Sequence, residues 1–405
     1  MIRYLKQEEK GKSRAMYEAN FPEDSRAFVD YYFSEKTKDN QILVMEEAGQ
    51  LQVMIHLNPY VFSVCGEHVE VNYVVAVATD AAVRKQGRMA QVMKRALQDM
   101  AEAHQPFTFL IPANPRVYVS SGFVFIPSEK YDAYKKQLVE EAGVKDTDLQ
   151  AAEIKHDVMG QNSAVAERKP AVSQKYDAAR MILRKAAVQD IPRMAAFSNE
   201  LLAREYDVFP WRTESYYQRM MAELASQNGA LVLIEQKKET EEQNRRSAGE
   251  ERELAGIFSY AMEKSVPGPE TKEHPDEIFG SDEEENGIEL QEILIAPEVR
   301  EHFADDITDY FGELPVQITD MNFMVRVLDL RVLGLLLRSE EPFSIKVQVR
   351  DDIIAANCGC FEIKADQTGS SITAISPEEA ECSMDITELT KFLFNKMKLF
   401  IREWV

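Results

Sequence analysis

Hydrophobic and polar residues alternate along the first 127 residues with the periods of strands and helices in turn. A short strand is expected at residues 2–5, helices within 14–33, and a hairpin of two strands over 41–57. Residues 69–79 are almost continuously apolar, which is typical of a strand buried on both faces. This order predicts an α/β unit in which helices flank a mixed sheet.

A polar loop at residues 80–87 separates the long apolar strand from a helix with one apolar face. A further strand is expected at 107–111, and the segment 117–125 closes the unit. The apolar residues of the helix recur at intervals of three and four, the helical period: Met89, Val92, Met93, Ala96, Leu97 and Met100.

The same order of elements recurs after a polar connector at residues 136–176. A strand at 181–184 and a helix at 188–202 repeat the opening, and a buried strand at 288–295 precedes a helix at 299–310. Charged runs between the strands of this part are expected to be solvated loops. Because one element order occurs twice at similar spacing, we interpret the second part as a degenerate copy of the first.

The last part of the chain has a different pattern. Residues 343–350 alternate with period two, as a strand does, and short strands are expected at 352–354, 359–363 and 371–374. Asp385 and Glu388 form a capping-box pattern at the start of an apolar helix. The sequence therefore predicts an α/β (α+β) protein with domains at residues 1–150, 151–318 and 319–405.

Charge excludes some partners but says little about the substrate. The chain of 405 residues has a net charge of −22, with 47 basic and 69 acidic side chains. Such an excess of acid argues against nucleic acid or anionic lipid as a partner, because both attract Lys and Arg. Residues 1–127 have a net charge of −1 and residues 321–405 of −3, so −18 falls in 128–320. Most of the negative charge therefore lies in the part of the chain where long solvated loops are expected.

The apolar segments and the cysteines of the chain bear on its compartment and on possible metal sites. No apolar segment has the length of a signal-peptide core or a membrane span, which predicts a cytoplasmic protein without membrane insertion. The four cysteines are expected to be reduced. Cys358 and Cys360 have no second Cys or His pair at ligand spacing, so we favour a strand with two small buried thiols over a metal site.

The segment that carries chemistry is the end of the apolar strand and the loop after it. Arg84 and Gly87 stand at R-x-x-G spacing just before the helix begins. The N–H groups of such a helix start, with the positive end of the helix dipole, suit a pyrophosphate. Gly87 allows a ligand to approach the backbone closely, and Lys85 and Arg88 add charge. The alternative is that Gly87 only makes a strand-to-helix turn with solvated basic neighbours.

With these residues the sequence resembles the GNAT superfamily of acetyl-CoA-dependent N-acetyltransferases, whose pyrophosphate loop reads Arg/Gln-x-x-Gly-x-Gly/Ala. Met89 stands at the last position, where a small residue is expected. The resemblance extends to the element order of residues 1–127 and implies acetyl-CoA as co-substrate, with the thioester on strand amides and the diphosphate on the loop. The residues implied to bind it are Val77, Ala78, Thr79, Arg84, Lys85, Gln86, Gly87, Arg88, Met89, Ala90 and Asn114.

The resemblance also implies a general acid. Tyr118 precedes the pair Gly122-Phe123 near the end of the first unit, which is where such enzymes commonly place this residue. A tyrosine hydroxyl can reprotonate the departing CoA thiolate. The alternative is a core aromatic whose hydroxyl bonds to the backbone.

Over nearly its full length the chain resembles the enhanced intracellular survival (Eis) family. The resemblance implies tandem GNAT folds followed by a domain like sterol carrier proteins, a homohexamer, and a cationic acceptor such as an aminoglycoside, polyamine or lysine amine. It also implies that the terminal carboxylate of Val405 returns to the first domain as general base. In the second copy the loop at 299–305 has no Gly and carries acids, so that copy is not expected to bind CoA.

These features predict direct acetyl transfer to a primary amine, since no Ser/His/Asp or Cys/His arrangement suggests a covalent intermediate. Two alternatives stay open. The sterol-carrier-like domain could bind a lipid or another hydrophobic ligand, rather than serve only as a scaffold that brings Val405 to the site. Met89 could mark a decayed acetyltransferase site.

Overall fold

The computed structural model describes residues 1–126, 134–135, 181–237, 252–262, 287–312, 314–318 and 321–402. The chain divides into two compact units. The first comprises Met1–Glu129, Val188–Gly229 and Asp320–Val405, and the second Lys130–Ala187 and Ala230–Thr319. Segments far apart in the sequence therefore share the first unit.

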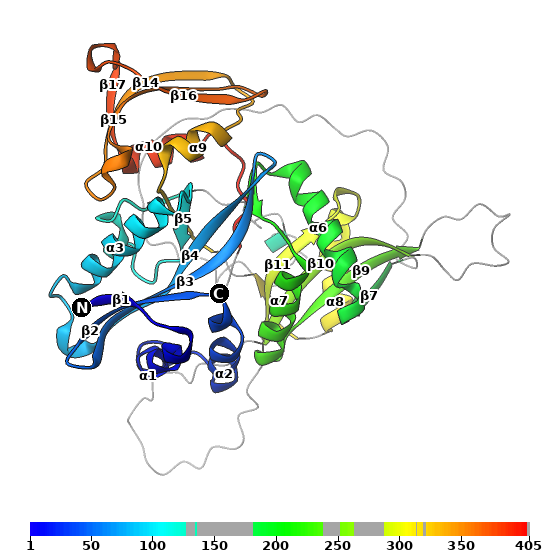
Figure 1. The fold of residues 1–405 in the computed structure, drawn as a ribbon. Coiled ribbons are helices and arrows are strands. Elements are labelled where there is room, and N and C mark those ends of the chain that lie inside the picture. The colour runs from blue at the N-terminus through cyan, green and yellow to red at the C-terminus, as the bar shows by residue number, and fades with distance from the viewer. Residues whose placement is uncertain are drawn as a thin grey trace, which may run out of the picture. The chain divides into compact units, whose positions relative to one another are not determined.

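Eight strands form the sheet of the first unit (Figure 1): β1 (Ile2–Tyr4), β2 (Gln41–Glu47), β3 (Gln50–Val64), β4 (Glu67–Thr79), β5 (Phe107–Leu110), β6 (Val124–Phe125), β8 (Val208–Pro210) and β13 (Met324–Val327). Their order is β1-β2-β3-β4-β5-β13-β6, and β8 pairs with β3. Strands β1 to β4 are antiparallel neighbours, whereas β5 runs parallel to β4. The predicted mixed sheet is confirmed.

Helices cover both faces of this sheet, because its strands alternate two sets of apolar side chains. Helices α1 (Arg14–Asn20) and α2 (Arg26–Ser34) pack on the face that carries Ile42 and Val44. Helix α3 (Arg88–Glu102) packs on the other face, which carries Leu43. The predicted apolar face of α3 is confirmed, since its buried residues are Val92, Met93, Ala96, Leu97 and Met100.

Strand β13 comes from the C-terminal part of the chain and completes the first sheet. It pairs antiparallel with β5 on one side and with β6 on the other. All four of its side chains are buried, including the charged side chain of Arg326. Residues 1–126 therefore do not complete their own sheet. No feature of the sequence pattern predicted this pairing, because an apolar run does not specify its partner.

Two further helices of the first unit follow the connector, α6 (Ile191–Glu205) and α7 (Glu214–Ser226). Helix α7 contacts α2, where the Tyr31 hydroxyl donates a hydrogen bond to the Glu223 carboxylate (3.1 Å). The short strand β8 lies between α6 and α7 in the chain and extends the sheet beside the end of β3.

The C-terminal part of the first unit forms a second sheet, in the order β16-β15-β14-β17. Its elements are α9 (Leu330–Leu336), β14 (Phe343–Arg350), β15 (Gly359–Ala365), β16 (Ser370–Ala374), β17 (Cys382–Asp385) and α10 (Ile386–Phe394). The predicted capping box of α10 is confirmed: the Glu388 N–H donates to the Asp385 carboxylate (2.9 Å), and the Asp385 N–H donates to the Glu388 carboxylate (3.0 Å).

Two predictions for this part are wrong. Residues 352–354 form no strand, because the Asp351 carboxylate accepts the backbone N–H groups of Ile353 and Ile354 and so turns the chain. Cys358 is exposed rather than buried in a strand, since it precedes β15. Its sulfur accepts the backbone N–H of Asp351 (3.3 Å) and thereby supports the same turn.

The second unit contains a five-stranded sheet in the order β12-β11-β10-β9-β7. Its strands are β7 (Met181–Lys185), β9 (Ala230–Lys237), β10 (Arg252–Met262), β11 (Ile288–Ile295) and β12 (Val316–Ile318). The first four are antiparallel neighbours and the last pair is parallel, which is the pattern of β1 to β5. The predicted recurrence of one element order is confirmed in this topology.

The helix after β11 begins differently from α3. Residues Pro297–His302 form a 3-10 turn that leads into α8 (Phe303–Phe311), and no glycine stands there. Asp305 and Asp306 lie in the first turn of α8, where they would repel an anion.

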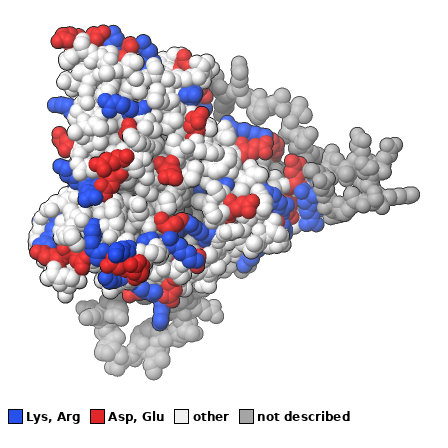
Figure 2. Space-filling model, viewed as in Figure 1, with Lys and Arg blue, Asp and Glu red and all other residues white. Residues whose placement is uncertain are grey.

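Charged side chains of both signs are interspersed over the face seen in Figure 2, without a large patch of either sign. None of the described helices is long and apolar enough to cross a membrane.

A buried histidine lies beneath α2. Nδ1 of His56 is 2.9 Å from the hydroxyl oxygen of Tyr32, and Nε2 is buried without a partner among the described residues. Burial lowers the pKa of His56 to about 3, and the nearby charge of Lys10 acts in the same direction. The imidazole is therefore neutral at neutral pH.

This burial predicts a loss of stability in acid. The folded pKa of His56 lies below the unfolded value of about 6.5, so the unfolded state binds the extra proton between these two values. The free energy of unfolding should fall by about 1.4 kcal/mol per pH unit from this residue alone as the pH drops through that window. Urea unfolding at several pH values would measure it. The His56→Gln protein should lose this component, whereas the same change at exposed His104 should keep it; equal slopes in all three proteins would contradict the prediction.

Candidate active site

Strands β4 and β5 are neighbours at one point only. Tyr73 pairs with Phe109, and no pairing between the two strands is formed beyond it in the described residues. Beyond this pair the end of β4, up to Thr79, forms no further ladder with β5 among the described residues. Such an edge can pair with an extended ligand that carries amide groups, as an added strand would.

A β-bulge lies within this unpaired part of β4. Met54 pairs with Ala78 and His56 with Val75, so two β4 residues stand opposite Ile55 alone. One of the two, Ala76, has a φ of 48°, which is unfavourable for a residue with a side chain. The bulge redirects the backbone at Val77 to Thr79, the amides that were expected to hold the thioester carbonyl. Backbone strain of this kind concentrates at functional sites.

The loop that follows β4 contains two residues with left-handed backbone conformations just before α3. Lys85 and Gly87 both have left-handed backbone conformations, with φ of 62° and 73°. Gly87 is the N-cap of α3 and offers no side chain to its free N–H groups, and nothing lies within 4 Å of the place where a Cβ would stand. Backbone N–H groups at such a turn form a concave site for an anion. The left-handed conformation at this N-cap, and not only the reversal of the chain, therefore explains why a glycine stands at position 87.

The basic side chains of the loop have different roles. Nη2 of Arg84 donates to the Asn20 side chain (2.8 Å) and its Nε to the carbonyl of Thr79 (3.1 Å), so it braces the loop. Arg88 pairs with Glu47 (2.6 Å), a contact that lowers the pKa of that carboxyl. Lys85 makes no hydrogen bond or ion pair with any described residue and is the loop's available cation.

Two other loop residues bear on ligand access. Met89 is half-buried and packs against the hydrophobic core under α3, so its side chain does not fill the space at Gly87. Gln86 is exposed and accepts a hydrogen bond from Nε of Arg88 (3.3 Å), and Ala90 is exposed. A cavity of about 550 Å³ opens beside the loop; Asn20, Gly49, Asp80, Ala81 and Arg84 are among the residues that line it.

Tyr118 lies on α4 (Arg116–Val119), which follows β5. Its ring is buried, with 9% of the residue exposed, and contacts Phe123. Its hydroxyl forms no hydrogen bond with any described residue and is not among the side-chain atoms enclosed without a partner. Burial raises the pKa of Tyr118 to about 12, so the hydroxyl is protonated at neutral pH. The alternative interpretation, in which the Tyr118 hydroxyl bonds to the backbone, is not supported, because no described backbone group is its partner.

Strands β4 and β5 are parallel, so their carboxyl ends point the same way, and α4 follows the end of β5 in the chain. Asn114 lies two residues before α4: its side-chain oxygen accepts the N–H of Arg116 (3.2 Å) and its carbonyl that of Val117 (3.2 Å). Tyr118 and Asn114 thus follow the end of β5, and the expected loop residues follow the end of the parallel strand β4.

The segment before the chain end is docked along β8. Leu399 bridges Val208 in parallel, and the N–H of Phe400 donates to the Val208 carbonyl (2.9 Å). Residues 399–402 are all buried. The predicted docking of the apolar tail is thus confirmed for these residues. Val405, with Glu403 and Trp404, lies outside the described residues.

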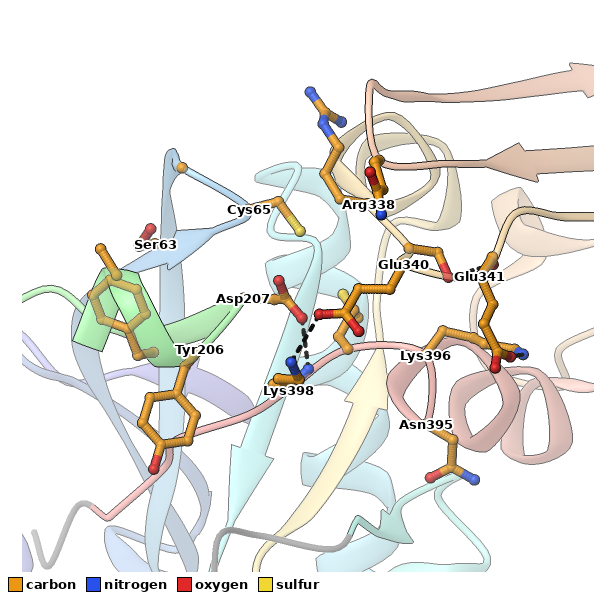
Figure 3. Close-up of a pocket in the computed structure, with 16 residues that line it drawn as sticks. Ser63, Cys65, Tyr206, Asp207, Arg338, Glu340, Glu341, Asn395, Lys396 and Lys398 are labelled. Carbon is orange, nitrogen blue, oxygen red and sulfur yellow. Dashed lines mark hydrogen bonds and ion pairs between the residues drawn. The ribbon is translucent and has the colours of Figure 1, made fainter. Parts of the chain in front are cut away.

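Polar contacts fix the start of this tail (Figure 3). The backbone N–H of Lys398 donates to the Asp207 carboxylate (2.7 Å), and its ammonium pairs with Glu340 (2.8 Å). These residues line a cavity of about 640 Å³ together with Tyr206 and Arg338. Sequence reasoning missed this anchor, because β8 is too short to be recognised from its pattern.

Among the described residues, no group of three or more His, Cys, Asp or Glu side chains is arranged to hold a metal ion.

Residues 1–126 match the family described as acetyltransferase (GNAT) domain. No curated protein matches the chain. Among solved structures, a GCN5-related N-acetyltransferase from Anabaena variabilis is similar over 97% of this chain and 90% of its own, with a TM-score of 0.65 and 13% identity. Eis1 from Mycobacterium abscessus is similar over 97% and 89%, with a TM-score of 0.60 and 11% identity.

A third similar structure is a protein of unknown function from Enterococcus faecalis, titled a probable N-acyltransferase. It covers 97% of this chain and 89% of its own, with a TM-score of 0.64 and 12% identity. At these identities the likeness shows the fold, which is shared over nearly the whole chain. The match of residues 1–126 to the acetyltransferase (GNAT) domain supports an N-acetyltransferase.

Proposed function

We propose that the chain transfers the acetyl group of acetyl-CoA directly to a primary amine. The observation that carries this proposal is the adjacency of a bulged, unpaired end of β4 and an anion-binding loop at the start of α3. The first suits a thioester with its amide-bearing arm, and the second suits a diphosphate. Acetyl-CoA combines these groups in one molecule.

The residues fit this ligand in separate ways. The diphosphate lies on the N–H groups around Gly87, with Lys85 as the nearest available charge. The thioester carbonyl accepts from backbone amides at Val77 to Thr79, which hold the oxygen as negative charge develops on it. The pantetheine arm runs along the free edge of β4, near Asn114. Met89 packs inward, so a decayed site has less support.

In the proposed mechanism the free amine attacks the thioester carbon, the C–N bond forms, and the C–S bond breaks. Tyr118 donates a hydrogen bond to the leaving sulfur, and the proton that the nitrogen loses as the amide forms ends on this sulfur, so CoA is released as the thiol. Because the Tyr118 pKa of about 12 exceeds that of a thiol, near 8.5, the hydroxyl acts mainly as a hydrogen-bond donor to the developing thiolate. The carboxylate of Val405 accepts the proton of the substrate ammonium as general base.

The docked tail supports the role proposed for Val405. Leu399 to Arg402 are buried along β8, so the three residues that follow start from a fixed point in the first unit. Three residues span about 10 Å at most when extended.

Further parts of the proposal rest on the resemblance. The acceptor is a cationic amine of the aminoglycoside, polyamine or lysine type. The chain is a cytoplasmic homohexamer with domains at 1–150, 151–318 and 319–405, the second of which does not bind CoA. The acids at the start of α8, and the absence of glycine there, support this last point.

The alternative of a hydrophobic ligand in the C-terminal part has less support. Its described apolar residues fill its interior: Val347, Ile363, Leu389 and Leu393 are buried. A Cβ on Gly334 would stand 3.0 Å from the Ile372 side chain, so α9 and β16 are in close contact. We therefore favour a scaffold role for this part.

The function is tested by adding acetyl-CoA and a panel of amines to the purified protein. Acetyl-CoA at 100 times its Kd should stabilise the fold by about 2.7 kcal/mol, seen as a rise in melting temperature. CoA release should depend on the amine, and mass spectrometry should find acetyl on its nitrogen. A protein that binds no acetyl-CoA would refute the proposal.

A change at Gly87 tests the diphosphate site. Gly87→Val forces a β-branched side chain into a left-handed conformation beside the ligand, so the Kd for acetyl-CoA should rise about tenfold or more, equivalent to about 1.4 kcal/mol. Isothermal titration would measure it. Gly66→Val is the matched control, since Gly66 also has a positive φ (90°) and open space but lies in the β3–β4 turn. Equal effects of the two changes would contradict the assignment.

A further inference from the structure

The turn that carries Tyr118 contacts a buried guanidinium. Arg326, on β13, is fully buried. Gly122 has a φ of 84°, and a Cβ there would collide with Nη1 of Arg326 and approach Ile386 to 3.1 Å. Gly122 is thus required both by its conformation and by the close approach of Arg326.

The turn transmits the position of Gly122 to Tyr118. The N–H of Gly122 donates to the carbonyl of Val119 (2.9 Å), and the N–H groups of Ser121 and Phe123 donate to that of Tyr118 (2.9 and 3.4 Å). These bonds join the two positions in one rigid element, so a shift at Gly122 moves Tyr118.

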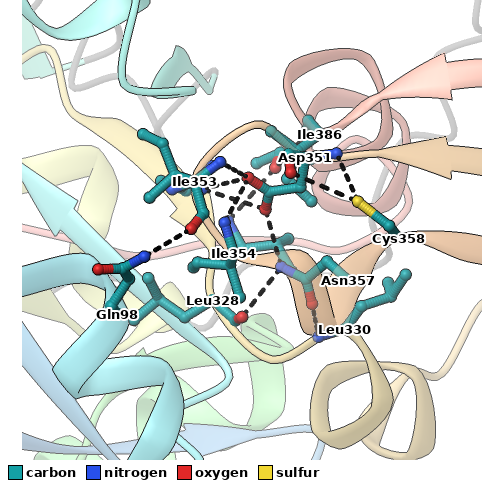
Figure 4. Close-up of polar contacts among 12 residues, drawn as sticks. Gln98, Leu328, Leu330, Asp351, Ile353, Ile354, Asn357, Cys358 and Ile386 are labelled. Carbon is teal, nitrogen blue, oxygen red and sulfur yellow. Dashed lines mark hydrogen bonds and ion pairs between the residues drawn. The ribbon is translucent and has the colours of Figure 1, made fainter. Parts of the chain in front are cut away.

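Asp351 holds the guanidinium in place. Nη2 of Arg326 donates to both carboxylate oxygens of Asp351 (2.9 and 3.1 Å). Burial raises the pKa of Asp351, but the Arg326 charge and the donated hydrogen bonds outweigh it, so the net shift is downward. The carboxylate also accepts from Nδ2 of Asn357 (2.9 Å) and from the N–H groups of Ile353 and Ile354 (3.0 Å each), as Figure 4 shows.

This network reaches the first domain's long helix. Nε2 of Gln98, on α3, donates to the carbonyl of Ile353 (3.0 Å) (Figure 4). Asp351 is therefore anchored both to the C-terminal sheet and to α3, and its distance from Arg326 is set by several bonds.

Stability alone gives a poor account of this pair. Nε and Nη1 of Arg326 are buried without a hydrogen-bond partner among the described residues. An unsatisfied buried donor costs about 1–3 kcal/mol, and a buried ion pair is a weak stabiliser compared with apolar side chains of the same size. The ion pair with Asp351 does fix the position of the Arg326 guanidinium next to the turn at Gly122.

The turn has room to move unless it is held. A polar cavity of about 390 Å³ lies on its Arg326 side, and Ser120, Ser121, Arg326 and Arg350 help to line it. Because this side of the turn is not closely packed throughout, its position depends on the contact of Gly122 with the guanidinium.

We propose that Arg326, held by Asp351, is a positioning residue that orients the Tyr118 hydroxyl toward the leaving sulfur of acetyl-CoA. Arg326 touches neither substrate in this proposal and acts through Gly122 and its turn. The inference rests on the proposed role of Tyr118, and it couples the C-terminal part of the chain to the acetyl-transfer step.

A double-mutant cycle tests the proposal. Arg326→Lys keeps the charge but loses the planar group that reaches Asp351 with Nη2 and Gly122 with Nη1. It should lower kcat about 10- to 100-fold, because a misplacement of about 1 Å can cost this much, with the Kd for acetyl-CoA unchanged. In a Tyr118→Phe protein the same change should lower kcat by less than about twofold, since residues that act as a unit are not additive.

Arg350→Lys is the matched control: Arg350 lines the same cavity but is exposed on β14, and kcat should not change. Leu393→Ala, a core change in α10, controls for lost stability. If Arg326→Lys lowers kcat equally with and without the Tyr118 hydroxyl, or leaves it unchanged, the positioning role is refuted while the proposed function stands. If Tyr118→Phe itself retains full kcat, the proposed role of Tyr118 fails instead.

Discussion

Replacement of Tyr118 by Phe is expected to lower kcat about 10²- to 10³-fold, since a positioned proton donor or hydrogen-bond donor contributes about this much to a transition state. The Kd for acetyl-CoA should change little. The ring of Tyr118 is buried in the core and remains in the variant, whereas its hydroxyl bonds to no described residue and its loss leaves no group unsatisfied. The variant should therefore fold normally.

Steady-state kinetics with an active amine, beside a thermal melt, separates chemistry from folding. A useful control is Tyr17→Phe: this buried tyrosine of α1 donates a hydrogen bond from its hydroxyl to Asp24 (2.7 Å), so its change affects stability rather than transfer. A Tyr118→Phe protein with undiminished kcat would exclude the hydroxyl as the donor to the sulfur.

Moving the terminal carboxylate should produce a loss of similar size. Adding two glycines after Val405 leaves the docked segment Leu399–Arg402 unchanged but displaces the carboxylate, and kcat at neutral pH should fall about 10²- to 10⁴-fold if that group is the general base. Binding of acetyl-CoA should persist. The loss should diminish as the pH rises. As long as the pH is below the pKa of the amine, each increase of one pH unit raises the fraction of free amine about tenfold.

This pH recovery separates the loss of a base from general damage. Phe400→Ala, which undocks the tail, should lose activity without this simple recovery, whereas Lys398→Ala, which removes only the exposed ion pair with Glu340, should retain activity. An extended protein with full kcat at pH 7 would show that another group takes the proton.

The sequence pattern predicted most elements of the first sheet and the loop at Gly87, because both depend on local signals. Alternation specifies strands, and one glycine before an amphipathic helix specifies the turn. It predicted neither the single pairing of β4 with β5 nor the bulge at Ala76. These depend on register, which is set by contacts between distant residues.

Side-chain partners were less predictable still. The spacing of Arg84 and Arg88 indicated added charge for an anion, yet Arg84 braces the loop and Arg88 pairs with Glu47. The role of Gly122 could not be read either, since it depends on Arg326, about 200 positions away in the chain. The failed strand at 352–354 has the same origin: Asp351 turns the chain with its side chain, and apolar periodicity does not record that.

Strand β13 has a consequence for the order in which the protein is made. The first sheet requires residues 324–327 between β5 and β6, so the domain that starts the chain cannot close until the ribosome has passed residue 327. At about 5–20 residues per second, β5 waits roughly 10–45 seconds with an unpaired edge after it emerges. Exposed edges of apolar strands invite pairing with other chains. During synthesis the sheet of residues 1–126 thus keeps an unpaired edge, suited to a chaperone, until residues 324–327 emerge.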